Sequence, residues 1–186
     1  MSKLHTLGWA VVLTALPVSL GLAVHTPAAP EPEAVIPVDL ATVAVQRAPF
    51  CDAVDATEIS AALGGSDPQT VATWEPGQVT QVTPDVDDVV NEFGCRWVGT
   101  KSAAAAWIYG PPVSLSTARR MSVVPQGCVP IDWQAFGAPS TAYLCGKRAV
   151  ASGLFGDAWV TCAISGQGAK GRLKDWCRAA ARAASG

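Results

Sequence analysis

Residues 93–109, FGCRWVGTKSAAAAWIY, decide the fold of this 186-residue chain. Two strand-like runs, 93–98 and 103–109, flank a four-residue segment, Gly99-Thr100-Lys101-Ser102, that contains a glycine. Apolar runs joined by three to five residues with a glycine are typical of a β-hairpin. The hairpin is therefore the first expected part of an antiparallel sheet.

A short helix is predicted before the hairpin. Asp55, followed three residues later by Glu58, forms a start that resembles a capping box, and Gly64-Gly65 ends the helix. Residues 66–91 are rich in Pro, Thr, Asp and Gln with scattered valines, so we expect a loop there with one short strand at most.

The sequence after the hairpin predicts a second helix, three strands and a final helix. Ser114 or Ser116 can cap the second helix, which ends near residue 121. The later elements are expected at 142–145, 148–152, 158–164 and about 170–184. This order of helices and strands predicts an α+β fold, in which helices cover one face of a small antiparallel sheet.

The first 25 residues are interpreted as a signal peptide or membrane anchor. Residues 7–24, LGWAVVLTALPVSLGLAV, are uncharged and follow Lys3 and His5, which is the order of an export signal. Their length is also close to the minimum for a helix that spans a membrane. Cleavage and retention both remain open.

Residues 26–48 are interpreted as a Pro/Ala-rich extracytoplasmic stalk. Their first part, residues 26–37, alternates proline with small and acidic residues and offers nothing to bury in a core. The remaining residues 49–186 have the length of one domain. We therefore expect a single disulfide-stapled domain outside the membrane, either membrane-anchored or secreted.

All six cysteines lie in this expected domain. An even number in a small exported domain is typical of a disulfide framework in an oxidising compartment. The two closest in sequence are 15 positions apart, which does not fit the close pairs of a zinc site. Three disulfides are expected among Cys51, Cys95, Cys128, Cys145, Cys162 and Cys177.

The net charge of −2 conceals a division along the chain. Residues 31–92 hold twelve acids and one base, whereas residues 93–186 hold three acids and eleven bases. These charges can face each other or water across one domain. Alternatively, the bases form a patch for an anionic partner such as lipid head groups or wall polymer.

The last predicted helix carries five of these bases. Lys174, Arg178 and Arg182 follow one another at four-residue intervals and are called the basic ridge below. The ridge is either a solvated surface or a site for anionic membrane or wall polymer. A separate apolar stripe, expected to face the sheet, consists of Leu173, Trp176, Cys177, Ala180 and Ala184.

Tryptophans supply the other candidate binding residues. Trp97, Trp107 and Trp159 stand in predicted strands beside aliphatic residues, so we expect them in the core. Trp74 and Trp133 stand in polar, loop-like stretches. We treat these two as candidate exposed binding residues, because indole rings give a large contact area at a low entropic cost.

The expected domain contains no histidine, which restricts its chemistry. His5 and His25 flank the apolar N-terminal segment. Triads with a histidine base and histidine-ligated zinc are therefore excluded from the folded part. A two-carboxylate hydrolase or a serine with a lysine base remains, but no carboxylate pair stands out. We predict no catalytic residue, no metal or other cofactor, and no nucleic-acid partner.

Three motifs follow one another along the domain. A cysteine directly precedes a capped helix ending in Leu-Gly (51–65, CDAVDATEISAALGG), a Cys-x-Trp strand follows (94–99, GCRWVG), and a glycine-containing turn leads into strands and a final amphipathic helix. This order resembles the exported actinobacterial proteins of domain-of-unknown-function family 3558, over about residues 51–184. The resemblance implies that Cys51 pairs with Cys95. The chain lacks the lipid-attachment cysteine of many such proteins and has four further cysteines, and the family implies no reaction.

Six cysteines can pair in fifteen ways, and the sequence does not decide among them. Proximity along the chain favours the pairs Cys51–Cys95, Cys128–Cys145 and Cys162–Cys177. In the last pair, the position of Cys177 on the apolar side of the helix allows it to reach Cys162 on the preceding strand.

The leading functional hypothesis is an exported, noncatalytic binding or interaction module. It rests on the missing histidines, the stalk and the disulfide framework. Its partner is an unknown envelope protein, a lipid head group or wall polymer. The alternative is a hydrolase of cell-envelope material that uses two carboxylates facing each other across a cleft, roughly 5–10 Å apart.

Export is testable by cell fractionation. We expect the protein outside the cytoplasm, with residues 26–37 accessible to added protease because they form no core. A cytoplasmic protein with free thiols would contradict both the export signal and the disulfide framework.

Overall fold

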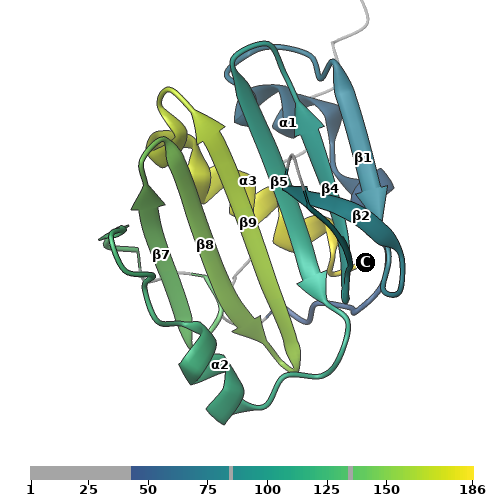
Figure 1. The fold of residues 1–186 in the computed structure, drawn as a ribbon, viewed down its shortest axis with the longest axis vertical. Helices are drawn as coiled ribbons and strands as arrows, with labels where there is room; N and C mark the ends of the chain where they lie inside the picture. Colours follow the sequence, from purple (N-terminus) through teal and green to yellow (C-terminus); the bar gives the residue numbers. More distant parts are fainter. Residues whose placement is uncertain (1–42, 84–85, 134–135) are drawn as a thin grey trace, which may run out of the picture. The chain divides into compact units, whose positions relative to one another are not determined.

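The computed structural model describes residues 43–83, 86–133 and 136–186, so residues 7–24 and most of the predicted stalk lie outside it. The described chain forms one seven-stranded sheet, one two-stranded sheet and three α-helices (Figure 1). The helices are η1 (Cys51–Ala53, a 3₁₀ turn), α1 (Ala56–Ala62), α2 (Leu115–Met121) and α3 (Ala169–Ala183). The strands are β1 (Thr70–Trp74), β2 (Val79–Thr83), β3 (Val86–Val89), β4 (Glu92–Val98), β5 (Ser102–Tyr109), β6 (Val129–Pro130), β7 (Ser140–Cys145), β8 (Arg148–Phe155) and β9 (Ala158–Gly166).

The large sheet is antiparallel throughout and has the order β1-β4-β5-β9-β8-β7-β6. Helix α3 passes behind the sheet in Figure 1 and contacts β8, β9 and α1. The predicted α+β fold is confirmed. One detail differs from the expectation that helices cover one face: α2 buries Ala118 with Leu154 and Trp159, which point to the face opposite α3.

The predicted hairpin is formed by β4 and β5, with Val98 paired to Ala103. The first predicted helix is α1, and its cap is Asp55. The side-chain hydroxyl and backbone N–H of Thr57 donate to Asp55 Oδ1 at 2.6 and 2.7 Å. These bonds favour the carboxylate and lower the pKa of Asp55 from 3.8. Ser114, rather than Ser116, caps α2 by accepting the N–H of Thr117.

The expectation for residues 66–91 was wrong. This segment holds β1, β2 and β3 rather than a loop with one strand at most. All residues of β1 except Trp74 are exposed, because β1 is an edge strand. Strands β2 and β3 pair only with each other. Because β1 has no buried residue, it lacks the apolar alternation that identifies a strand in sequence.

The predicted stalk boundary at residue 48 is also too late. Val45 is 8% exposed and packs with the core. The backbone N–H of Gln46 donates to the carbonyl of Ala184 at 2.8 Å. Arg47 pairs with Asp157 at 3.2 Å. Residues from Val43 onward therefore belong to the folded domain.

The core lies between α3, α1 and one face of the sheet. On β5, Ala104, Ala106 and Ile108 point to this face and are 0% exposed. The five residues of the predicted apolar stripe of α3 are all buried against it. Trp176 lies edge-on to Trp97, with ring centroids 5.4 Å apart. The alanines on β5 leave the space that the indole of Trp176 fills.

The three disulfides have the favoured connectivity. Their Cα–Cα separations are 5.8 Å for Cys51–Cys95, 4.6 Å for Cys128–Cys145 and 5.5 Å for Cys162–Cys177. Bridges of this kind persist in oxidising compartments outside the cytoplasm. Within the described ranges, no helix is both long enough and apolar enough to cross a membrane.

Two disulfides allow a matched test of stability. The Cys162→Ala/Cys177→Ala variant should lose about 3 kcal/mol of unfolding free energy, because its bridge spans 15 positions. The Cys128→Ala/Cys145→Ala variant removes a bridge of similar span, 17 positions, so the lost chain constraint is nearly equal.

The two variants differ in burial. Cys162 and Cys177 are 0% exposed, whereas Cys128 and Cys145 are partly exposed. Removing the buried bridge therefore also leaves a cavity under α3. Denaturant unfolding should show the larger loss for the Cys162/Cys177 variant, and the reverse order would contradict the position of that bridge in the core.

Candidate functional site

The face of the large sheet that α1 and α3 leave uncovered is called the open face. Strand pairing places Gly94 of β4, Trp107 of β5, Thr161 of β9 and Ser152 of β8 in one row across this face. Trp74 of β1 extends the row beside Gly94. A Cβ atom on Gly94 would collide with the Trp74 indole, so the glycine leaves room for the ring against β4.

A groove of about 450 Å³ lies on the open face. Strands β5, β7, β8 and β9 form its floor, and the end of α2 with the following loop forms one wall. The Cys128–Cys145 disulfide fastens this wall to β7. The lining residues are Trp107, Met121, Pro125, Tyr143, Cys145, Arg148, Val150, Ser152, Trp159 and Thr161.

Polar and aromatic groups converge in this groove. Ser152 and Thr161 are buried, and their hydroxyl oxygens are 2.8 Å apart, so each is hydrogen-bonded. Trp107 and Tyr143 are half-buried and present the remainder of their rings to the solvent. Arg148 is exposed at the start of β8 and is the only charged residue of the described lining.

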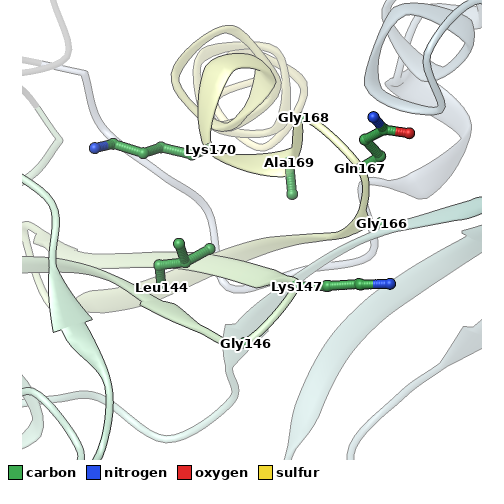
Figure 2. A pocket seen from close by; sticks show the side chains of 8 residues that line it. All are labelled: Leu144, Gly146, Lys147, Gly166, Gln167, Gly168, Ala169 and Lys170. Atoms are coloured by element: carbon green, nitrogen blue, oxygen red, sulfur yellow. The ribbon is translucent and has the colours of Figure 1, made fainter.

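A second hollow, of about 440 Å³, lies where α3 begins (Figure 2). It is lined by Lys147, Lys170 and the turn Gly166-Gln167-Gly168. The two lysine side chains point away from each other to opposite sides of the hollow, while Ala169 and Leu144 point into it (Figure 2). Because its charged groups diverge, this hollow is a weaker candidate than the groove.

The predicted aromatic candidates lie in different surroundings. Trp74 is half-buried at the sheet edge, on the open face. Trp133 lies in a loop, is also half-buried, packs against the core and stacks on Phe136 with ring centroids 5.5 Å apart. Trp97 and Trp159 are buried as expected, at 4% exposure each. The expectation for Trp107 was wrong, since its ring is half-buried and lines the groove.

The basic ridge lies on the outer side of α3, and two of its three members are near carboxylates. Arg178 lies 3.6 Å from Asp175, and Arg182 lies 3.6 Å from Glu58 of α1. Lys174 is exposed. The ridge and the groove are on opposite sides of the sheet, so the structure does not bring all the predicted binding residues together.

Acidic side chains of the described residues do not cluster at the groove or at the hollow where α3 begins. Among the described residues, no three His, Cys, Asp or Glu side chains gather closely enough to hold a metal ion. The described linings of the groove and of the hollow at α3 contain no Asp or Glu.

Comparison of the chain with protein-family models, with curated proteins and with solved structures finds no match. The resemblance to family 3558 stays a prediction.

The basic ridge yields a prediction about membranes. The variant Lys174→Glu/Arg178→Glu/Arg182→Glu should sediment with anionic vesicles to the same extent as the unaltered protein, because carboxylates near Arg178 and Arg182 already offset part of the charge. Its unfolding free energy should fall by at most about 1 kcal/mol, since exposed ion pairs contribute little. Salt-sensitive binding by the unaltered protein that the variant loses would instead establish the ridge as a membrane site.

Proposed function

We propose that this chain is an exported, noncatalytic binding module of the cell envelope, and that its ligand site is the groove on the open face. An N-terminal signal or membrane anchor would deliver the domain to the outer side of the membrane. The three disulfides are consistent with that compartment.

One observation carries the proposal. The groove combines two half-buried aromatic rings, a buried hydroxyl pair and one arginine on a floor of four adjacent strands. Binding sites are typically concave and mostly apolar, with a few convergent polar groups. The floor cannot move without disturbing the sheet, and the Cys128–Cys145 bridge restrains the wall. A preformed site of this kind loses little entropy when it binds.

The residues that line the groove favour a binding role over hydrolysis. A two-carboxylate mechanism needs an acid and a base on opposite sides of the scissile bond. The described lining of the groove offers neither Asp nor Glu, and its hydroxyls have no lysine beside them in that lining. Its aromatic rings, hydroxyl pair and arginine can hold and orient a ligand.

Position-specific crosslinking tests the proposal. A photo-crosslinking amino acid replaces Tyr143 in the groove or, as the control, Lys174 on the outer side of α3, in the full chain expressed in its own envelope. Crosslinks to envelope material should form from position 143 and not from position 174. Equal capture from both positions would contradict the assignment of the site.

A second variant links the capture to the groove. Trp107→Ala should reduce crosslinking from position 143 at least tenfold, because an aromatic residue at the centre of a binding site commonly contributes about 2 kcal/mol or more of binding free energy. Lys174→Ala in the same background should leave capture unchanged. The thermal midpoint of each variant is measured, so that loss of capture by a folded Trp107→Ala protein can be separated from unfolding.

A further inference from the structure

Strand β1 forms one edge of the large sheet and has no buried residue. It pairs with β4 and, in the described part of the chain, with no other strand. Its first four residues are exposed, including Val71 at 54%. The outer side of an edge strand presents unpaired backbone N–H and C=O groups, which can pair with a further strand.

The two edges of the large sheet differ in their protection. At the far edge, β6 has only two residues, and one of them is Pro130. A strand this short that contains a proline offers little to an added strand. Strand β1 has five residues, TVATW, without a proline or a charge, and its register with β4 has no bulge. The β1 edge is therefore the one that can accept a further strand.

The sequence of β1 complements a second copy of itself. A two-fold axis at Ala72 would make two β1 strands antiparallel, which is the arrangement of every strand pair in this sheet. Val71 would then lie opposite Thr73 of the second copy, and Thr70 would lie opposite Trp74. Pairs of this kind, between β-branched residues or between a β-branched and an aromatic residue, stabilise antiparallel strands.

The residues that flank β1 permit the same alignment. Glu75 would lie opposite Gln69 of the second copy, and Pro76 would lie opposite Pro68. An acid thus meets an amide rather than a like charge. The prolines lie outside the five paired residues, where they limit the added ladder to β1 itself.

Pairing through β1 would also cover apolar surface at the edge of the core. Val71 is in register with Trp97 of β4, whose ring is buried, so Val71 points to the side of the sheet that α3 covers. Val71 nevertheless remains exposed, because it lies at the margin of that side. In the paired arrangement, Thr73 of the second copy would lie beside Val71 and shield it from water.

We infer that two copies of this chain associate through their β1 strands, so that their large sheets form one continuous antiparallel sheet. The interface is isologous, since each copy contributes the same strand. Residues opposite each other across the axis point to the same side, so both open faces lie on one side of the pair. Strand β1 is not part of the groove lining, and both grooves therefore stay accessible. Two grooves on one side go beyond the proposed function of a single site, because a ligand that spans both is bound more tightly.

Charge reversal at the two-fold axis tests the association. Two differently tagged full-length copies are expressed together, and the second copy is quantified after capture of the first. Ala72→Lys in both copies, or Ala72→Glu in both, places like charges directly opposite each other and should reduce recovery of the second copy about tenfold. Ala72→Lys in one copy with Ala72→Glu in the other replaces the repulsion with an ion pair and should restore recovery. Ala72 is exposed, so the thermal midpoints of these variants should stay unchanged.

The far edge of the sheet provides the matched control. Val129 of β6 is also exposed, at 64%. The same lysine and glutamate substitutions at Val129 should leave recovery unchanged. Ala72→Thr should retain recovery as well, because it introduces a β-branched residue and no charge.

Each other outcome would overturn the association through β1. These outcomes are no recovery of the second copy for the unaltered chain, full recovery with every Ala72 variant, failure of the Lys/Glu combination to recover more than the like-charged combinations, and an equal loss with the Val129 variants. Crosslinking from position 143 tests the groove separately, because Tyr143 lies on β7. Failure of the β1 association therefore leaves the proposed function standing.

Discussion

The packing of Trp176 against the centre of the sheet is the contact on which the rest of this structure depends. Its ring is 1% exposed, meets Trp97 edge-on, and donates its indole N–H to the carbonyl of Ala105 at 2.9 Å. The indole can approach the strands this closely because β5 presents Ala104 and Ala106 on this face. The turn of α3 that carries Trp176 thus fixes the distance between this helix and the sheet. The Cys162–Cys177 bridge, next to Trp176 in sequence, holds the same distance covalently.

This arrangement determines which surface is left for binding. Helices α1 and α3 cover the centre of one face, and the short α2 covers only the end of the other, around Leu154 and Trp159. The groove lies on this second face. Antiparallel sheets commonly have one packed and one solvated face. Here the solvated face carries aromatic rings and arginines, whereas the outer side of α3 carries the more conspicuous run of bases.

The sequence predicted those elements whose ends carry local signals. Asp55 caps α1 as predicted, although its side chain accepts from Thr57, and the glycine turn after Val98 joins the hairpin. The groove could not be predicted, because its members come from strands and a loop that only the tertiary fold brings together. In AAAAWIY, alanines occupy both faces of β5, so the alternation that would have assigned Trp107 to the open face is absent. A long helix with regularly spaced bases is visible in the sequence, whereas a surface assembled from a few residues of each of four strands is not.

The first and last parts of the described chain meet in the finished domain. Gln46 bonds to the end of α3, α1 contacts α3, and Val45 joins the same core. A chain that emerges from a channel with its N-terminus leading therefore cannot close this core until its final helix has followed. Until then the apolar face of the seven-stranded sheet lacks α3, and β1 presents an unpaired edge. Premature stops near the C-terminus should therefore be more damaging than their small size suggests, because they leave a nearly complete sheet without the helix that covers its centre.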